Sequence, residues 1–562
     1  MDGKIMEKYE IWCKKAALDP DLKAELSAMK GDDAAIESAF YRSLEFGTAG
    51  LRGVIGAGTN RMNVYSVGQA TKALADYIKN HFVEEKRTVA IGYDSRIKSE
   101  LFAKTAAGVL AAAGIHVYIY SELLPVPCVS FAVRALHTAA GVMVTASHNP
   151  SKYNGYKVYD DAGCQIVTEA ADEILADINA TDYFTDVTFG DFDALLAEGK
   201  IEYTPEWVYR AYLDVVKRQS VLGNVAIDKD IAIVYTPLNG AGLKPVTEAL
   251  KETGFTNITL VEEQKNPDGH FPTCPYPNPE IFEAMKLGME YAEKTGAALL
   301  LATDPDSDRV GTAVRAKDGS YRLISGNEMG CLLLNYICEL RTKNGTMPEN
   351  PVAVKSIVST DLVFGIAAHY GVEVKNVLTG FKFIGNEIAK LEEAGRPEAY
   401  IFGFEESYGY LPGGYVRDKD AVSASLLICE MFCYYQGQGV SLLEKLEELY
   451  ETYGYYQNIG LAFSYEGIQG AARMKELMAA FRGGISAIGT SPVEKTEDYA
   501  AGLYGLPPAD VLKFFLPEGT VIIRPSGTEP KVKVYFSVKG KTLEEAQATA
   551  EKLKALVTPM MA

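Results

Sequence analysis

Three carboxylates occupy alternate positions directly after an apolar run, at Asp304, Asp306 and Asp308. Side chains of like charge packed this closely repel one another, and a hard divalent cation relieves the repulsion by taking their oxygens as ligands. The segment is not an EF-hand loop, because Arg309 stands where that loop needs glycine and Arg315 where it needs glutamate. The triplet therefore predicts a divalent-metal site, and a solvated acidic loop is the alternative.

A serine and a histidine stand at the end of a predicted strand, in the segment Thr-Ala-Ser-His-Asn-Pro. The hydroxyl of Ser147 can act as a nucleophile or carry a phosphoryl group. The residues around it do not form the G-x-S-x-G elbow, so a hydrolase triad is not supported. Lys157 follows on a predicted alternating strand over 153–160. The alternative is that Ser147 and His148 only build a turn.

The segment from 403 to 410 places Glu405, Glu406 and Ser407 after another predicted strand. Paired carboxylates beside a hydroxyl are suitable partners for the hydroxyl groups of a sugar. The alternative interpretation is the charged start of a helix.

The loop from 524 to 531 joins two predicted strands and offers a guanidinium, two hydroxyls and a glycine. Such groups suit a phosphate held by side chains and backbone amides. Lys531 and Lys533 add positive charge and favour an anion site over a plain Ser-Gly turn.

Strand and helix patterns alternate through most of the chain, which predicts largely parallel α/β layers in three similar blocks. Ligands in such sheets bind near the carboxyl ends of strands, where the polar segments stand. The last block has a different order and predicts a small α+β domain. The segments with predicted strands are 88–94, 115–121, 139–147, 231–242, 258–263, 298–309, 351–359, 372–385, 398–407 and 458–467, and 521–538 predicts two strands around a loop. The predicted helices lie at 99–114, 279–296, 470–484 and 542–557, and others end at Gly254, Gly371 and Gly395.

Composition excludes several classes of protein. The 562 residues include 55 Lys and Arg against 74 Asp and Glu, a net charge of −19 that argues against binding nucleic acid or an anionic membrane. The eight cysteines form no C-x-x-C pair, which favours reduced thiols over disulfides or zinc. The first twenty residues lack the apolar core of a signal peptide and predict an amphipathic helix. No Walker P-loop is present.

Together these segments resemble the α-D-phosphohexomutase family. The resemblance implies four domains around a central cleft: three similar α/β domains with mixed, mostly parallel sheets and a C-terminal α+β domain. The implied domains are 1–205 with a phosphoserine loop, 206–324 with a metal loop, 325–455 with a sugar-recognition loop and 456–562 with a phosphate loop. The matching segments, in the order of the family, are GTAGLRG (47–53), TASHNP (145–150), DPDSDR (304–309), TGFKFIG (379–385), FEES (404–407) and RPSGTEP (524–530).

The resemblance also implies roles for individual residues. Ser147 would carry the phosphoryl group and, with Asp304, Asp306 and Asp308, hold Mg²⁺. The residues implied to line the reacting centre are Arg52, His148, Lys157 and Arg309. The residues implied to bind the sugar and the phosphate that does not react are Thr379, Gly380, Lys382, Glu405, Ser407, Arg417, Lys419, Arg524, Ser526, Gly527 and Thr528. One branch of the family has Gly-His after the recognition serine, whereas this chain has Tyr408-Gly409-Tyr410 and so offers no histidine there.

The reaction implied is the reversible interconversion of glucose 1-phosphate and glucose 6-phosphate through glucose 1,6-bisphosphate, which would also act as activator. Phosphopentomutase and phosphomannomutase activities remain open with the same machinery. From other classes, a metal-dependent sugar phosphatase and a silent sugar-phosphate-binding protein are alternatives. We expect a cytoplasmic protein, a monomer or small homo-oligomer, whose partner is a small sugar phosphate and not a nucleic acid or membrane.

Overall fold

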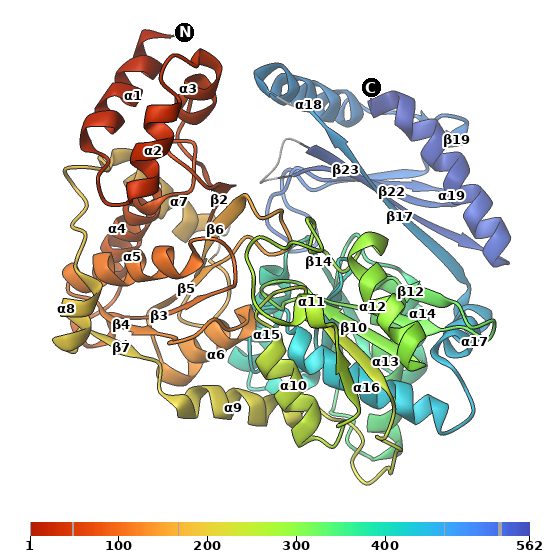
Figure 1. The fold of residues 1–562 in the computed structure, drawn as a ribbon. Coiled ribbons are helices and arrows are strands. Elements are labelled where there is room, and N and C mark those ends of the chain that lie inside the picture. The colour runs from red at the N-terminus through yellow and green to blue at the C-terminus, as the bar shows by residue number, and fades with distance from the viewer. Residues whose placement is uncertain (1, 48–49, 167, 466, 527–530, 562) are drawn as a thin grey trace. The chain divides into compact units, whose positions relative to one another are not determined.

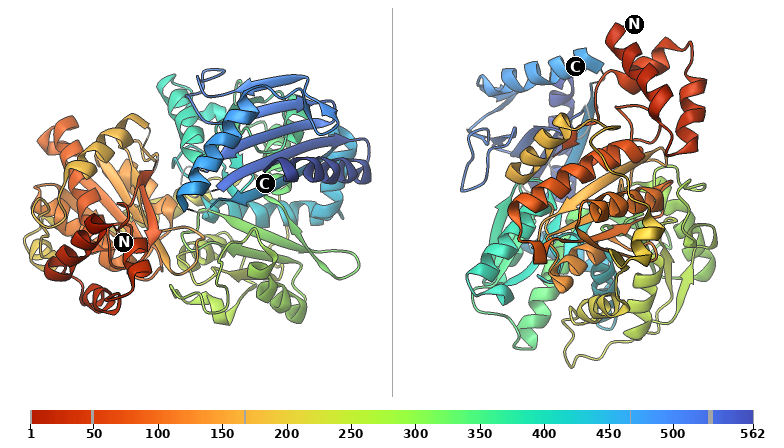
Figure 2. Two further views of the ribbon diagram at one scale, coloured as in Figure 1. Left: turned by 90° about the horizontal axis from the view of Figure 1, so that it is seen from above. Right: turned by 90° about the vertical axis from the view of Figure 1, so that its left-hand side faces the viewer.

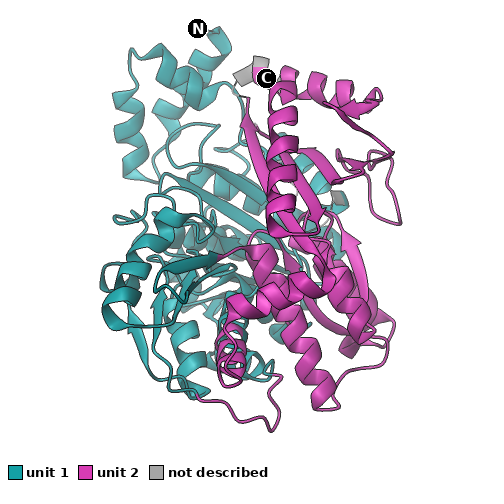
Figure 3. Ribbon diagram, turned by 90° about the vertical axis from the view of Figure 1, so that its right-hand side faces the viewer, with its two compact units in different colours: residues 1–220, 229–323, 413–427 teal, residues 221–228, 324–412, 428–562 magenta. Residues whose placement is uncertain are grey.

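The computed structural model describes residues 2–47, 50–166, 168–465, 467–526 and 531–561. The chain divides into two compact units (Figure 3). The first contains residues 1–220, 229–323 and 413–427, and the second contains 221–228, 324–412 and 428–562. The division at 205, 324 and 455 that the sequence suggested stays a prediction.

The first unit contains a seven-stranded sheet in the order β1-β2-β6-β5-β3-β4-β7 (Figure 1). Strands β4, β3 and β5 are parallel neighbours, whereas β6 runs antiparallel to both β5 and β2. The strands are β1 (Phe46–Gly47), β2 (Gly50–Val54), β3 (Thr88–Tyr93), β4 (His116–Ile119), β5 (Ala140–Val144), β6 (Tyr153–Tyr159) and β7 (Ile201–Tyr203).

Helices cover both faces of this sheet. Apolar residues of α4, α5 and α7 share one core with the sheet, while α6 packs on the opposite face, where Gly92 and Gly141 leave room for Val129 and Val133. Because both faces are covered, β6 is buried from Asn154 to Tyr159 instead of alternating between core and solvent. The helices of this region are α1 (Gly3–Lys15), α2 (Pro20–Ala28), α3 (Asp33–Phe40), α4 (Val64–His81), α5 (Ser99–Ala112), α6 (Val126–Leu136), α7 (Thr168–Ala180), α8 (Phe192–Ala197) and α9 (Glu206–Lys217).

A second sheet of the first unit has the order β12-β11-β10-β8-β9. Strand β8 is parallel to β9 and β10, and β11 runs antiparallel to β10. Its elements are β8 (Ile233–Thr236), α10 (Leu243–Glu252), β9 (Ile258–Leu260), α11 (Glu262–Lys265), α12 (Phe282–Thr295), β10 (Leu299–Thr303), β11 (Val310–Arg315) and β12 (Tyr321–Ile324).

The second unit contains a third sheet of the same design, in the order β14-β13-β15-β16. Strand β13 is parallel to β14 and β15, and β16 runs antiparallel to β15. The elements of this part of the chain are α13 (Gly326–Lys343), β13 (Val352–Ser356), α14 (Leu362–Tyr370), β14 (Glu373–Val377), α15 (Phe381–Glu393), β15 (Tyr400–Glu405), β16 (Gly409–Leu411), α16 (Ala421–Gln436) and α17 (Leu442–Tyr453).

The three sheets carry their polar loops at the same topological position. In each, a strand with a parallel neighbour is followed by a loop and then by an antiparallel strand, at β5–β6, β10–β11 and β15–β16. Each loop also holds a non-glycine residue in the left-handed region, with φ of 53° at Ser147, 52° at Ser307 and 65° at Tyr408. The prediction of three similar α/β domains with mixed sheets is confirmed.

The C-terminal part of the second unit is an antiparallel sheet in the order β17-β23-β22-β21-β20. Helices α18 and α19 share one apolar core with it and lie over the same face (Figure 2). This confirms the predicted α+β domain. Its elements are β17 (Tyr455–Ser464), α18 (Gly467–Arg482), β18 (Ala487–Ile488), β19 (Ser491–Pro492), β20 (Lys495–Asp498), β21 (Leu512–Leu516), β22 (Gly519–Pro525), β23 (Lys531–Gly540) and α19 (Leu543–Val557). No helix in the described residues is long and apolar enough to cross a membrane.

Candidate active site

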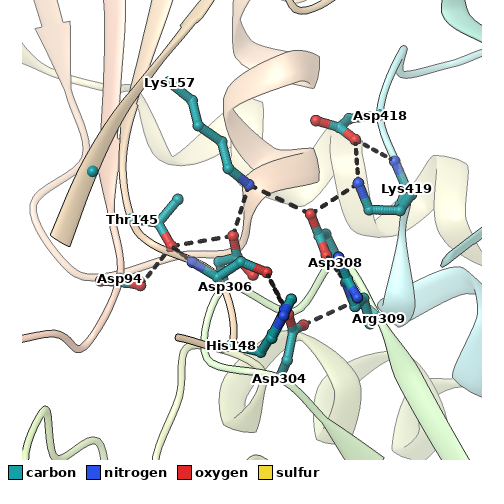
Figure 4. Close-up of polar contacts among 12 residues, drawn as sticks. Asp94, Thr145, His148, Lys157, Asp304, Asp306, Asp308, Arg309, Asp418 and Lys419 are labelled. Atoms are coloured by element: carbon teal, nitrogen blue, oxygen red, sulfur yellow. Dashed lines mark hydrogen bonds and ion pairs between the residues drawn. The ribbon is translucent and has the colours of Figure 1, made fainter. Parts of the chain in front are cut away.

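The three aspartates of the 304–309 loop form a buried cluster in the first unit (Figure 4). Asp304, Asp306 and Asp308 are at most 2% exposed, and one carboxylate oxygen of each lies within 4.8 Å of the others. The Oδ1 atom of Asp306 is buried and accepts no hydrogen bond from the described residues. Converging buried oxygens with unused capacity are what a hard cation requires, so the cluster fits a divalent metal.

Two buried lysines offset part of this negative charge. Lys157 Nζ lies 2.9 Å from Asp306 Oδ2 and 3.5 Å from Asp308 Oδ2, and Lys419 Nζ lies 3.1 Å from Asp308 Oδ2. Burial alone would raise the pKa of Asp308, but Lys419, Lys157 and Arg309 outweigh burial and hold that pKa well below its ordinary range. Burial, together with repulsion from Asp306 and Asp308, raises the pKa of Asp304 well above its ordinary value. The charged form of Asp304 is therefore disfavoured in this cluster, and a nearby cation would stabilise it.

Lys419 reaches the cluster because residues 413–427 belong to the first unit. Asp418 holds the lysine, with Oδ1 3.1 Å from Lys419 Nζ. The other oxygen of Asp418 accepts hydrogen bonds from Tyr159 Oη at 3.0 Å and Gln165 Nε2 at 2.8 Å. Sequence reasoning assigned Lys419 to the sugar, whereas the structure places its ammonium group on the aspartate cluster. Arg417 is buried and donates to carbonyl groups of its own segment, including Gly414 O.

Ser147 lies directly beside the cluster. Its Oγ donates to Asp304 Oδ2 at 2.9 Å, and His148 Nδ1 is 3.3 Å from the same Oγ. Burial of the imidazole lowers the pKa of His148, and the positive charges of Arg309 and Arg52 lower it further. The imidazole is therefore neutral at pH 7 and can accept a proton next to the serine hydroxyl.

Two arginines complete the positive surroundings of the serine. Arg52, on β2, donates to Asn149 Oδ1 at 3.3 Å. Arg309 follows Asp308 and forms an ion pair with Glu280, and its backbone N–H donates to Asp304 Oδ1 at 3.0 Å. Burial would lower the pKa of Arg309, but Glu280 and the aspartates raise it, so the guanidinium stays charged. The structure thus brings together the predicted Ser147, His148, Arg52, Lys157, Arg309 and the three aspartates.

Three residues behind the serine were not predicted: Asp94, Arg96 and Thr145. Thr145 Oγ1 donates to Asp94 Oδ2 at 2.7 Å, lies 3.1 Å from Asp306 Oδ2, and accepts the backbone N–H of Ser147 at 2.9 Å. The sequence carries a signal for two of them, since Asp94-Ser95-Arg96 stands at the end of the predicted strand 88–94, as the other polar segments stand at the ends of theirs.

The second unit brings two of the predicted sugar-binding segments, 379–382 and 405–407, together at the β15–β16 loop. Glu405 Oε1 accepts the backbone N–H of Gly380 at 2.6 Å, which brings the 379–382 segment to the loop. Thr379 Oγ1 is buried without a hydrogen-bond partner among the described residues. Ser407 is half-buried in the loop, and Lys382, at the start of α15, has Nζ 5.3 Å from the ring centroid of Phe383.

Glu406 is engaged inside the second unit. Its Oε2 accepts from Ser356 Oγ at 3.1 Å and Ser359 Oγ at 3.4 Å, and its backbone N–H donates to Ser359 Oγ at 3.0 Å. Its carboxylate therefore helps to hold the loop.

The predicted phosphate loop begins at the end of β22. Arg524 is half-buried and stands opposite Lys533 in the sheet, so both side chains share the face away from α18 and α19. The backbone N–H of Ser526 donates to Lys531 O at 2.7 Å. Gly527 and Thr528 lie outside the described residues.

Models of the phosphoglucomutase/phosphomannomutase family match this chain in order. The α/β/α domains I, II and III match residues 43–184, 210–319 and 325–453, and the C-terminal domain matches 469–555. Among solved structures, a phosphoglucomutase/phosphomannomutase family protein of Burkholderia thailandensis aligns at TM-score 0.66 and 20% identity, over 92% of this chain and 97% of that one. Parafusin of Paramecium aligns at TM-score 0.66 and 16% identity, over 92% and 95%. These two show the same fold.

Curated relatives are more similar in sequence. A protein of Staphylococcus saprophyticus named phosphoglucomutase is 37% identical over 521 residues, covering 90% of this chain and 93% of that protein. A Staphylococcus aureus protein of the same name is 35% identical over 564 residues, covering 98% of both chains. With all four domain models matched in order and relatives this similar along nearly the whole chain, the protein belongs to the phosphoglucomutase/phosphomannomutase family.

Proposed function

We propose that this chain is a phosphoglucomutase, an enzyme that interconverts glucose 1-phosphate and glucose 6-phosphate through a phosphorylated Ser147. One observation carries the proposal: the Ser147 hydroxyl contacts a buried aspartate triplet flanked by Lys157 and Lys419. The hydroxyl donates to Asp304, so it lies where a phosphoryl group on Ser147 would meet a cation held by the three aspartates. The name phosphoglucomutase on relatives of 35–37% identity supports the choice of glucose.

The phosphoryl group would move from Ser147 Oγ to the free hydroxyl of the sugar phosphate. The P–Oγ bond breaks, a new P–O bond forms on the sugar, and the hydroxyl proton ends on Ser147 Oγ. Neutral His148, 3.3 Å from Oγ, is placed to pass that proton. The resulting glucose 1,6-bisphosphate then returns its other phosphoryl group to Ser147 by the same exchange in reverse.

The residues present fit Mg²⁺ in the aspartate cluster. Asp304, Asp306 and Asp308 would hold the ion together with the phosphate on Ser147. When bound, it would neutralise charge on the transferring phosphoryl group. Arg52, Lys157 and Arg309 supply further fixed positive charge, which gives an acidic protein a local basic surface for an anion.

The second unit supplies candidates for holding the rest of the substrate. We assign the sugar to the region of Thr379, Gly380, Lys382, Glu405 and Ser407. We assign the phosphate that is not being transferred to the loop of Arg524, Ser526, Gly527 and Thr528. The four domains with these loops would be 1–205, 206–324, 325–455 and 456–562. We place the enzyme in the cytoplasm, because none of its eight cysteines, all described, forms a disulfide.

Phosphomannomutase activity is the second candidate, because the matched family models cover both enzymes. Assays with glucose, mannose and pentose 1-phosphates, each with catalytic glucose 1,6-bisphosphate, decide between the sugars. We expect the highest kcat/KM with glucose 1-phosphate. A higher kcat/KM with mannose or pentose 1-phosphate would make that sugar phosphate the assigned substrate. Release of inorganic phosphate without sugar-phosphate isomerisation would make the protein a phosphatase and contradict the proposal.

A further inference from the structure

We propose that Arg96 and Asp94 are positioning residues that fix the backbone turn on which Ser147 stands. The inference rests on the proposed function in one respect, that the task of this turn is phosphoryl transfer. Neither side chain contacts the serine hydroxyl itself, so the role is exerted through the backbone.

Arg96 forms hydrogen bonds all along the turn. Its Nη2 donates to the carbonyl groups of Ser147 and Asn149, and its Nη1 donates to the carbonyl groups of Pro150 at 3.1 Å and Tyr153 at 3.2 Å. The guanidinium is completely buried. One side chain therefore binds four carbonyl groups, three in the loop between β5 and β6 and one, that of Tyr153, at the first residue of β6.

Asp94 fastens the other side of the same turn. It accepts the backbone N–H of Arg96 at 3.0 Å and lies 3.4 Å from Arg96 Nε, so it orients the guanidinium. Its Oδ2 accepts from Thr145 Oγ1, and Thr145 in turn accepts the backbone N–H of Ser147. Ser147 is thus held at its N–H through Thr145 and at its carbonyl through Arg96.

The turn needs this support because Ser147 has a φ of 53°, a left-handed conformation that costs energy for any residue with a Cβ. We call the hydrogen bonds of Arg96 and Asp94 to this turn the clamp. Without the clamp, the backbone of Ser147 would relax to negative φ and its Oγ would move away from Asp304. A lysine cannot replace the clamp, since a single ammonium group cannot serve four carbonyl groups spread along a turn.

A loop of the second sheet region covers the clamp. The guanidinium carbon of Arg96 lies 5.1 Å from the ring centroid of Phe271, and a Cβ added at Gly269 would lie 2.4 Å from the backbone N of Ile97. Phe271 therefore packs on the guanidinium, and Gly269 packs on the backbone next to Arg96.

The test compares Arg96→Lys with a matched control, Arg87→Lys. Arg87 also donates to two backbone carbonyls, those of Lys79 and Phe82, in the same unit but at the end of α4. For Arg96→Lys we expect kcat to fall by about 100-fold, the usual cost of misplacing a reacting group by about 1 Å, with KM for glucose 1-phosphate within about threefold of wild type. Amide hydrogen exchange in residues 145–153 should become faster. The control should leave all three quantities unchanged.

The isosteric Asp94→Asn variant covers the case in which Arg96→Lys fails to fold. We expect the same pattern in weaker form: lower kcat, unchanged KM and faster exchange in 145–153. An unchanged kcat and exchange rate in the folded variant would overturn the inference, as would a loss of activity that merely follows the loss of folded protein. An inactive wild type would instead contradict the proposed function, while the exchange of 145–153 still decides whether the clamp exists.

Discussion

The β10–β11 and β15–β16 loops occupy the same place in two similar sheets, yet their carboxylates differ in their hydrogen-bond partners. In the β10–β11 loop, Asp306 keeps a buried oxygen without a hydrogen-bond partner, and three carboxylates converge within 4.8 Å. In the β15–β16 loop, Glu405 accepts a backbone N–H and Glu406 accepts two serine hydroxyls.

The difference shows that one backbone design serves two chemistries. Carboxylates that repel one another and face lysines are suited to a cation and a transferring phosphoryl group. Carboxylates already fixed by neutral donors are rigid acceptors, which suits recognition of sugar hydroxyls. Position in the fold marks where a site can be, and the partners of each carboxylate decide which kind of site it is.

The largest effect should come from Asp306→Asn. Removing one ligand of the cluster should lower kcat by about 100-fold or more, because a bound cation supplies several kcal/mol of transition-state stabilisation. The control is Asp318→Asn, which changes an exposed residue between β11 and β12 of the same sheet and should leave kcat unchanged. Full activity of the wild type in excess chelator would refute the metal site.

Mg²⁺ should stabilise the wild-type protein and not the Asp306→Asn variant. A ligand at 100 times its Kd adds about 2.7 kcal/mol to the free energy of unfolding. Differential scanning calorimetry with and without Mg²⁺ measures this as a rise in Tm. An equal rise in both proteins would mean that the ion binds elsewhere.

Glu405→Gln should impair catalysis without unfolding the protein. The amide oxygen can still accept the N–H of Gly380, but an amide presents one acceptor where the carboxylate presents two. We expect kcat/KM to fall by an amount that corresponds to about 1–3 kcal/mol of lost transition-state stabilisation, the scale of a hydrogen bond to a charged group. Unchanged kinetics on every sugar phosphate tested would leave Glu405 a structural residue.

Glu406→Gln should have the smallest effect, although it is the neighbouring glutamate. Its partners are the hydroxyls of Ser356 and Ser359, which can donate to an amide oxygen as well. We expect a change of about 1 kcal/mol or less in the free energy of unfolding and little change in kcat/KM. A loss equal to that of Glu405→Gln would remove the distinction between the two residues.

Much of this could be predicted from the sequence. Hydrophobic runs followed by polar segments located β5, β10 and β15 and their loops, because a buried strand leaves its functional residues at its end. The spacing of Asp304, Asp306 and Asp308 was enough to predict a metal cluster.

Other features could not be predicted, because they depend on contacts between distant segments. Lys419 meets Asp308 only because residues 413–427 pack into the first unit. Arg96 binds backbone carbonyls, which leave no pattern in side-chain types. Strand β20 was also missed, since it is short and carries charged residues at three of its four positions.

The most direct test of the account is where phosphate resides during turnover. The protein is incubated with glucose 1,6-bisphosphate, which leaves as a glucose monophosphate once it has given one phosphoryl group to the protein. Intact mass and peptide mapping are recorded before and after the incubation. The account predicts a single phosphate, mapped to Ser147 in wild type and absent from Ser147→Ala, together with loss of mutase activity in that variant. A phosphate mapped to another residue, or normal turnover by Ser147→Ala, would contradict it.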